Sequence, residues 1–367
     1  MRLSFASAAF AALFCSQSSH ALNILLNNDD GWASANIRET YRLLKEAGHD
    51  VLMVAPVVDN SGQGGRHGNH AKTLVPKAVF STEANLTMNG EFNSVLAGAP
   101  ALDHDPLDDH IWYYNGTPAA CTFVNLDFVM PRIWPNVSAP DLLVSGPNVG
   151  QNLGPFLYTL SGTMGATYAA VSRGVPAIAF SAASTGGQRS YEWINETTAS
   201  GYPDPATINA ELTVKLVQQL ISATPKGERI LPVGYGINVN FPTITSFTND
   251  SCVEPPFILS RLTGGALSDI AVYNATTKLF RYGDIVGPGI NTCINGDCSL
   301  PGETEVIESG CRSAVSVFTV DYDAPIGKNF TSVQSKLTPL VHKETGLKKR
   351  SIHLNEANQR PYPWRHE

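Results

Sequence analysis

Residues 23–31, Asn-Ile-Leu-Leu-Asn-Asn-Asp-Asp-Gly, join a short apolar run to two adjacent carboxylates. The run Ile24–Asn27 predicts a buried strand, and a helical pattern begins soon after Gly31. Open α/β sheets bind ligands in the crevice beyond the carboxyl ends of their strands, so Asp29 and Asp30 are candidate ligands for a hard cation. The alternative is an ordinary turn, which is the commoner structure for an Asx-rich tetrapeptide that ends in Gly.

A helix and a second strand are predicted directly after this stretch. Ile37, Tyr41 and Leu44 recur at helical spacing, and Gly48 closes the pattern before an apolar run over residues 51–55. This order is a βαβ unit, which places parallel strands side by side. Further apolar runs predict strands over residues 142–145, 177–181 and 236–241. The expected fold class is therefore α/β, with a Rossmann-like parallel sheet that carries helices on both faces.

The second half of the chain divides into a helix, a β-rich part and a polar end. The helix begins at Asp204, a capping residue, with Pro205 in its first turn, and Pro225 stops it. Beyond Pro242 the sequence is rich in β-branched residues, Gly, Pro and Cys, which predicts strands. We expect an α/β core over about 22–242, a β-rich extension over about 243–341, and a polar, loosely ordered tail over 342–367.

The composition limits the classes of partner. The chain has 367 residues, of which 43% are hydrophobic and 16% charged, so it can bury a large core. Its formal net charge is -7 and its pI is about 5.7. Proteins that bind nucleic-acid polymers present clustered Lys and Arg instead. We therefore expect no nucleic-acid polymer as a partner, whereas a nucleotide monomer is compatible with this charge.

The first 21 residues have the pattern of a signal peptide. Arg2 supplies a positive end, residues 3–14 an apolar stretch, and Ser19-His20-Ala21 a small-x-small cleavage site. The apolar stretch is too short for a membrane-spanning helix, and no later segment has the roughly 20 apolar residues that spanning requires. We expect a secreted protein whose mature chain begins near Leu22, without a membrane anchor.

Cysteines and sequons agree with the secretory route. Beyond the leader, four of five cysteines fall in one segment: Cys252, Cys293, Cys298 and Cys311. Two disulfides are expected among them, because their irregular spacing lacks the C-x-x-C pairs of the alternative, a zinc site. Cys121, in an apolar helical pattern, is expected to be a buried thiol. Asn-x-Ser/Thr sequons at Asn85, Asn115, Asn136, Asn195, Asn249, Asn274 and Asn329 predict a glycoprotein.

Further polar motifs follow the other predicted strands at the same edge of the sheet. Ser61 lies in the loop after the second strand, and Ser145-Gly146-Pro147-Asn148 follows the third and opens a loop that contains Asn152. So many glycines beside amide side chains indicate close backbone approach to a ligand. Ser161-Gly162-Thr163 then opens an Ala-rich helix, whose positive end suits a phosphate. The alternative is that Ser161 is an ordinary helix cap.

Taken in order, these motifs resemble the SurE-like survival proteins, which are metal-dependent phosphatases that act on nucleoside monophosphates. The resemblance rests on Asn28-Asp29-Asp30-Gly31, Ser61-Gly62, Gly116-Thr117-Pro118 with Cys121, Ser145-Gly146-Pro147-Asn148, Asn152-Leu153-Gly154, Ser161-Gly162-Thr163 and Asn238-Val239-Asn240-Phe241-Pro242. It covers residues 23–242 well and is weaker toward residue 320. The ordered set is highly specific, and it implies the fold and the activity of that family.

The resemblance also implies a site. Its metal ligands fall on Asp29, Asp30, Ser61 and Asn148, an oxygen-donor set that suits Mg²⁺ or Mn²⁺ rather than zinc. Such a cation would polarise a phosphoryl oxygen and activate the water that attacks phosphorus. Asn152, Ser161 and Thr163 would cradle the phosphate oxygens. One of the two aspartates would assist proton transfer, although a carboxylate that binds metal is a poor base.

Two places depart from the pattern of this family. Ala120 stands where many relatives carry an acidic residue, so any contact made by that carboxylate is lost. The loop after Ser61 is rich in Gly and contains Arg66, His67 and His70. These three side chains either contact substrate phosphate, with His protonation favouring activity at mildly acid pH, or belong to a solvated loop.

The expected function is a secreted, divalent-metal-dependent phosphomonoesterase that hydrolyses nucleoside monophosphates. A broad-specificity acid phosphatase is the near alternative. A non-catalytic secreted protein that binds nucleotides or metal is the alternative from another class. The presence of all four ligands together with a phosphate-facing helix end favours the enzyme. Family members form dimers or tetramers through exchanged C-terminal elements, so the resemblance implies a homodimer or a homotetramer, unless the disulfides hold these elements on their own protomer.

Overall fold

The structure, a computed structural model, describes residues 21–62, 78–184, 186–262, 270–283, 299–321 and 328–337. Several sequence predictions lie outside these ranges: the leader up to residue 20, the basic loop with Arg66, His67 and His70, the cysteines Cys293 and Cys298, and the polar tail. No helix within the described ranges has both the length and the apolar character that crossing a membrane requires.

Nine strands of the described residues form one sheet in the order β3-β4-β2-β1-β5-β6-β7-β11-β8. The strands are β1 Asn23–Asn27, β2 Asp50–Pro56, β3 Leu102–Asp105, β4 Asp108–Tyr114, β5 Leu142–Val149, β6 Ala177–Ala182, β7 Tyr235–Phe241, β8 Phe257–Leu259 and β11 Ser313–Thr319. From β4 to β7 all neighbours are parallel. The α/β prediction is confirmed, and the sequence analysis missed the β3–β4 hairpin at one edge.

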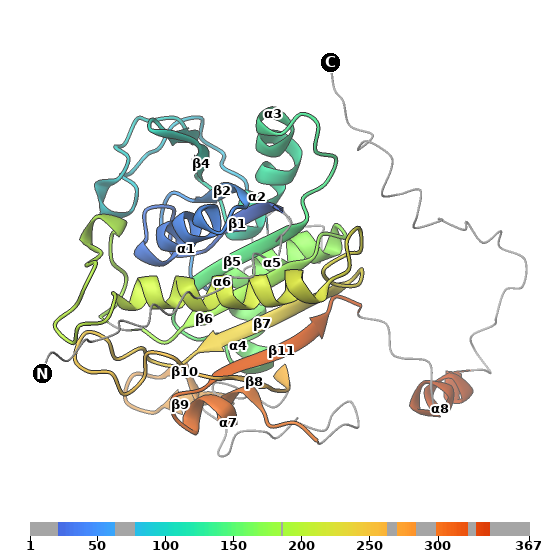
Figure 1. Ribbon diagram of the computed structural model, residues 1–367. Coiled ribbons are helices and arrows are strands. Elements are labelled where there is room, and N and C mark those ends of the chain that lie inside the picture. Colours follow the sequence, from blue (N-terminus) through green and yellow to red (C-terminus); the bar gives the residue numbers. More distant parts are fainter. Residues whose placement is uncertain are drawn as a thin grey trace, which may run out of the picture.

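Helices cover both faces of this sheet (Figure 1). The helices and helical turns of the described residues are α1 Ala35–Glu46, α2 Pro118–Val124, the π-helical turn Asn125–Val129, α3 Met130–Ile133, α4 Gly154–Leu160, α5 Gly162–Ser172, α6 Pro205–Ala223, α7 Glu303–Glu308, α8 Lys328–Leu337, and the 3₁₀ turns Glu91–Asn93 and Tyr191–Trp193. Helices α1 and α6 pack together on one face, and α2 and α5 on the other. The sheet lies between them, and its strands alternate: Ile24 and Leu26 point to one core, Leu25 to the other.

The predicted helix boundaries are confirmed by their capping contacts. Asp204 accepts a hydrogen bond from the Ala206 N–H at 2.9 Å and precedes Pro205 at the first turn of α6. In α1, the apolar face made by Ile37, Tyr41 and Leu44 is buried against the sheet. The sequence signals for α1 and α6 therefore agree with the way these helices cap and pack.

The part of the chain beyond Pro242 is tied into the core. Strand β11 pairs antiparallel with β7, and β8 pairs with β11, so both extend the central sheet. A second small sheet consists of β9 Ile270–Asn274 and β10 Leu279–Gly283. A disulfide joins Cys252 to Cys311, one of the two disulfides that we expected. Cys121 is free and buried, as predicted.

Strand β5 is longer than the sequence indicated. The predicted strand ended at Ser145, with a loop to follow, but the structure continues it through Asn148 to Val149 with a shift of register against β6. The shift occurs at Gly146, which has a φ of 105° and is followed by a cis peptide bond to Pro147. A Cβ at Gly146 would lie 2.1 Å from the carbonyl oxygen of Phe180. Only glycine lets the two strands approach this closely.

Replacing Gly146 with alanine should therefore destabilise the fold severely. We expect Gly146→Ala to lower the free energy of unfolding by more than about 3 kcal/mol, because the new methyl group meets backbone that cannot move cheaply. The matched control is Gly174→Ala, where φ is 78° but no atom lies within 4 Å of the added Cβ. That variant should lose only about 1–2 kcal/mol. Chemical denaturation measures both, and equal losses would contradict this account.

Candidate metal centre

Asp29 and Asp30 follow β1 at the carboxyl edge of the sheet, and their exposed fractions are only 2% and 1%. The turn that carries them is fixed by Asn28, whose Nδ2 donates to the Gly31 carbonyl at 3.0 Å and to Ser34 Oγ at 3.1 Å. The segment is thus a turn, as the simpler alternative held. However, ordinary turns leave their carboxylates in water, and this one buries two of them.

Helix α5 holds the first carboxylate. Thr163 Oγ1 donates a hydrogen bond of 2.6 Å to Asp29 Oδ1. Gly162 lies so close that a Cβ on it would be 2.8 Å from the Asp29 Cβ. Burial raises the pKa of Asp29 from 3.8 to about 6, and the Thr163 hydrogen bond opposes this rise. Asp29 is therefore a carboxyl group that would gain from a nearby positive charge.

The end of β5 and the loop after β6 hold the second carboxylate. The Val149 N–H donates to Asp30 Oδ2 and the Gln188 side chain donates Nε2–H to Oδ1, both at 2.9 Å. Burial first, and the charge of Asp29 second, raise the pKa of Asp30 well above its usual range. The sequence analysis missed Gln188, which lies in the loop after β6. Its position after the next strand of the sheet was the signal that could have identified it.

Asn148 supplies a third oxygen to the same edge. It lies at the end of β5, directly before the Val149 that contacts Asp30, and its Nδ2 donates to the Gly150 carbonyl at 2.7 Å. Its Oδ1 is buried and has no hydrogen-bond donor in the described part of the chain. A buried acceptor without a partner costs free energy in a finished fold, so a ligand is expected to satisfy it.

Ser61 is placed on the loop that borders the pair but is turned toward another residue. The Asn60 N–H donates to the Asp29 carbonyl at 2.7 Å, which ties this loop to the site. The Ser61 hydroxyl is exposed and donates to Asp59 Oδ1 at 2.7 Å. The charge of Asp59 raises the pKa of both Asp29 and Asp30, so it belongs to the site electrostatically. The sequence analysis did not identify Asp59, and the role of Ser61 as a ligand stays a prediction.

The residues predicted to cradle phosphate have protein partners. Asn152 is buried and donates from Nδ2 to Ser181 Oγ at 2.7 Å. Ser161 caps α5 by accepting from the Met164 N–H at 3.2 Å, which is the alternative role considered for it. Thr163 contacts Asp29, as described above. Contact of these three residues with a phosphate stays a prediction.

The donor set fits a hard divalent cation. Burial disfavours the ionisation of Asp29 and Asp30. The unpaired Oδ1 of Asn148 lies on the strand end beside them. Oxygen ligands of this kind bind Mg²⁺ or Mn²⁺, with water to complete the shell. Asp29, Asp30 and Asn148 would hold such an ion, and bringing it to them would offset the cost of burying two like charges.

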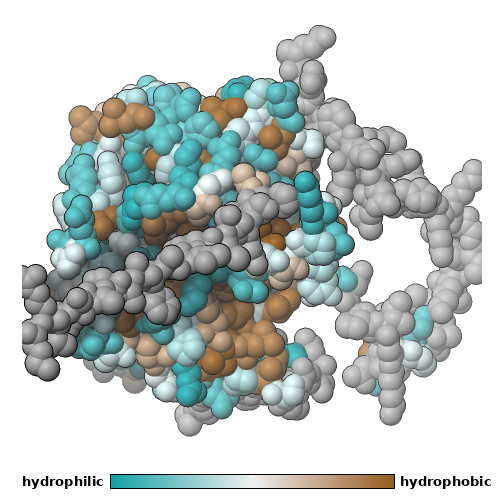
Figure 2. Space-filling model, viewed as in Figure 1, coloured by the Kyte–Doolittle hydropathy of each residue, from teal (hydrophilic) through white to brown (hydrophobic). Residues whose placement is uncertain are grey.

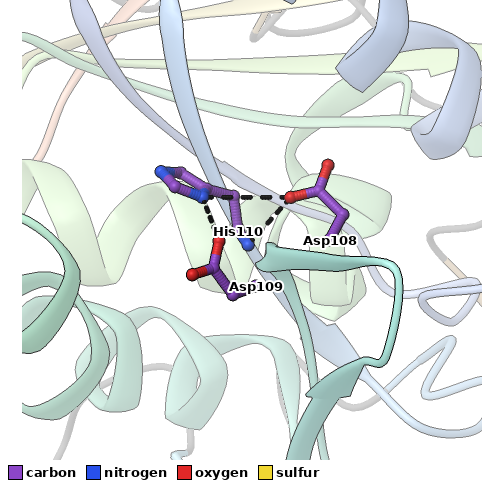
Figure 3. A group of neighbouring side chains, drawn as sticks. All are labelled: Asp108, Asp109 and His110. Atoms are coloured by element: carbon purple, nitrogen blue, oxygen red, sulfur yellow. Dashed lines mark hydrogen bonds and ion pairs between the residues drawn. The ribbon is translucent and has the colours of Figure 1, made fainter.

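Figure 3 shows a second acidic group, made by Asp108, Asp109 and His110. Asp108, Asp109 and His110 begin β4, whose parallel alignment with β2 places them near Asp50, far from the carboxyl edge. The His110 Nδ1 contacts Asp109 Oδ1 at 2.7 Å, and the hydroxyl of Tyr41 donates to Asp108 Oδ2 at 2.7 Å. These side chains satisfy one another, so the buried pair is the stronger candidate for a metal site.

Comparison with known proteins shows what the chain is similar to. The model of the family described as Survival protein SurE matches residues 24–254. An acid phosphatase of Yarrowia lipolytica is 43% identical over 309 residues, which are 82% of this chain and 80% of that protein. A 5'-nucleotidase SurE of Lawsonia intracellularis is 30% identical over 61% of this chain and 67% of its own length. The crystal structure of the Aquifex aeolicus SurE protein has the same fold, with a TM-score of 0.54, 20% identity, and coverage of 86% of this chain and 99% of that chain.

Removing the hydroxyl that contacts Asp29 should weaken metal binding. We expect Thr163→Val to lower the affinity for Mn²⁺ about tenfold at pH 6, because a hydrogen bond to a charged group contributes about 1.5–3 kcal/mol. The matched control is Thr167→Val in the same helix, whose hydroxyl donates only to the Thr163 carbonyl. Calorimetric titration measures both affinities. A control that loses as much affinity as Thr163→Val would refute the specific role of this contact.

The stabilising effect of metal should depend on pH. Because the folded-state pKa of Asp29 is raised from 3.8 to about 6, the contribution of this group to the stability of the metal-free fold is fully present below pH 3.8 and is lost as the pH rises through 6. A cation binds the ionised forms of Asp29 and Asp30, so its affinity should fall at least tenfold for each pH unit below 6. We expect Mn²⁺ to raise the melting temperature clearly at pH 7.5 and little at pH 4.5. A shift of equal size at both values, or one that persists in Asp30→Asn, would contradict this.

Proposed function

We propose a specific reaction for this chain, which belongs to the Survival protein SurE family. The chain is a hydrolase of the phosphatase and nucleotidase class. We propose that it cleaves phosphate monoesters, nucleoside monophosphates among them, at the buried Asp29–Asp30 pair and with a divalent cation. The observation that carries this proposal is the pair itself, with the unpaired Asn148 Oδ1 beside it.

The chemistry divides between the ion and the protein. A bound Mg²⁺ or Mn²⁺ supplies Lewis acidity toward a phosphoryl oxygen and toward water. The protein fixes the ligands before substrate arrives: Thr163 orients Asp29, while the Val149 N–H and Gln188 orient Asp30. Such preorganisation avoids the cost of rearranging dipoles during the reaction. The positive end of α5, which packs against Asp29 through Gly162, would stabilise the substrate phosphate.

The substrate range is proposed to include nucleotides without being limited to them. The bacterial relatives are named 5'-nucleotidases, which supports nucleoside monophosphates, and the Yarrowia lipolytica relative is named an acid phosphatase. A broad-specificity secreted acid phosphatase is therefore the second candidate. A non-catalytic nucleotide- or metal-binding protein is the remaining alternative, and the hydrolase names of the relatives speak against it.

We also propose that the protein is secreted and glycosylated. The leader pattern over residues 1–21 and the seven sequons support this location. The Cys252–Cys311 disulfide is of a kind that persists in oxidising compartments.

Self-association is proposed as well, as a homodimer or homotetramer. Hydrophobic residues gather on the lower part of the face seen in Figure 2, on the side where the strands after β7 lie in Figure 1. Exposed apolar side chains of these strands are Leu259, Ile270, Tyr273, Leu279, Phe280 and Val317. Contiguous apolar surface of this kind is typical of interaction sites. Light scattering of the purified chain measures the mass of the assembly.

The reaction is tested with the mature chain from Leu22 after its metal is removed by chelation. We expect phosphate release from nucleoside monophosphates to require added Mn²⁺ or Mg²⁺. Asp29→Asn and Asn148→Ala should each lower kcat/KM by about a hundredfold or more, because they remove an ion ligand. The control is Asp109→Asn in the group of Asp108, Asp109 and His110 at the amino ends of the strands. This variant should stay within twofold of the wild type.

Three outcomes separate the candidates. Preference for nucleotides over p-nitrophenyl phosphate supports a nucleotidase, and equal rates with both substrates support the broad acid phosphatase. Absence of phosphate release with any metal between pH 4 and 9 would support the remaining alternative, a non-catalytic binding protein. Loss of activity in Asp109→Asn but not in Asp29→Asn would indicate that the metal binds at the amino ends of the strands instead.

A further inference from the structure

We propose that Glu303, a buried carboxylate of α7, is a positioning residue that holds the loop between the metal-binding strand end and the phosphate-facing helix. This inference rests on the proposed function, because it concerns the geometry of that same site. Glu303 lies outside the residues that match the family model, which end at residue 254. The C-terminal part of the chain would thus contribute directly to the order of the catalytic edge.

Both oxygens of Glu303 are used by this loop and its neighbouring strand. Oε2 accepts from the Gly154 N–H at 3.0 Å, and Oε1 accepts from Asn238 Nδ2 at 2.9 Å. The side chain is 0% exposed, and Ser316 of β11 hydrogen-bonds to it as well. Each of these contacts comes from a different element: α4, β7 and β11. Glu303 therefore joins the start of α4 to two strands of the central sheet.

Asparagines of β7 extend this clamp to Asn152. The Asn238 Nδ2 that contacts Glu303 also donates to the Asn152 carbonyl at 3.1 Å. Asn240 donates to the same carbonyl at 3.2 Å and accepts from the Asn152 N–H at 2.7 Å. Side chains thus hydrogen-bond the backbone groups of Asn152 and Gly154, in a region where no neighbouring strand of the described residues pairs with them.

The position of the clamped segment explains why it matters for the reaction. The segment begins at Asn148, the proposed ligand, and at Val149, whose N–H holds Asp30. It ends at α5, where Thr163 holds Asp29. Its two ends therefore contact the two carboxylates of the site, and Glu303 fixes its middle. A loosened middle would displace both ends together, and displacements of about 1 Å at a reacting centre can cost a hundredfold in rate.

The placement of Glu303 is costly for the fold. Burial raises the pKa of this carboxyl from 4.5 to about 7, whereas its hydrogen bonds to Gly154, Ser316 and Asn238 oppose the rise. Two N–H groups point at its two oxygens, an arrangement that an ionised carboxylate satisfies by accepting at both. Buried groups of this kind that are retained against their desolvation cost cluster near functional sites. The hydrogen-bond geometry of Glu303 and the free-energy cost of burying it thus both support a positioning role.

The test compares Glu303→Gln with Glu305→Gln. Glutamine keeps the size of the side chain but turns one oxygen into an N–H donor that faces another donor. Glu305 is exposed on the same helix and serves as the matched control. We expect Glu303→Gln to lower kcat at least tenfold, with a smaller change in KM, and to weaken Mn²⁺ binding measured by calorimetry without substrate. Glu305→Gln should stay within twofold of the wild type in each measurement.

A second variant covers the case in which Glu303→Gln does not fold. Asn238→Ala keeps the Glu303 side chain and removes its link to Asn152, so it should lower kcat as well. Measurements are made well below the melting temperature of each variant, so that a general loss of stability does not contribute. A folded Glu303→Gln or Asn238→Ala protein with wild-type kcat and wild-type Mn²⁺ affinity would overturn the proposal. A wild-type chain that binds Mn²⁺ but releases no phosphate would refute the proposed function alone, and the Mn²⁺ affinities of the variants would still test Glu303.

Discussion

The burial of two adjacent carboxylates at the end of β1 is the constraint around which the site is organised. Like charges in a low-dielectric interior repel each other and lose their hydration, so each must be supplied with donors. Those donors come from Thr163 at the start of α5, from the Val149 N–H at the end of β5, and from Gln188 after β6. Three separate segments are thereby fixed against one turn, and the parallel sheet brings their ends to one edge.

The polar groups behind this edge are as important as those that face it. Asparagines of β7 and a glutamate from α7 satisfy backbone groups of the loop that follows β5. Buried polar networks specify one arrangement when every member has a partner. Asn148 Oδ1 is one of the buried acceptors that have no donor in the described residues, and it lies at the strand end where a ligand would add to the network.

Much of the fold could be predicted from local signals, because apolar runs and capping residues act within a few positions of each other. The α1 pattern and the Asp204 cap are examples. The β3–β4 hairpin and the longer β5 escaped prediction, since a bulge at Gly146 depends on the neighbouring strand. At the site, carboxylates directly after a strand were recognisable. Gln188 and Asp59 lie farther beyond the ends of β6 and β2, so their place after a strand is a weaker signal and only tertiary contacts bring them to the pair. Glu303 is separated from its partners Gly154 and Asn238 by more than 60 residues.

The pairing of β11 with β7 has a consequence for where this chain can be cut. The family match ends at residue 254, yet β7 has one side covered by β6 and the other by β11, which begins only at Ser313. A fragment that stopped at the family boundary would leave β7 as a bare sheet edge, a template for the addition of strands from other molecules. The region that matches the family therefore does not complete its own sheet in this protein, and β11 covers the edge that would otherwise be open to other molecules.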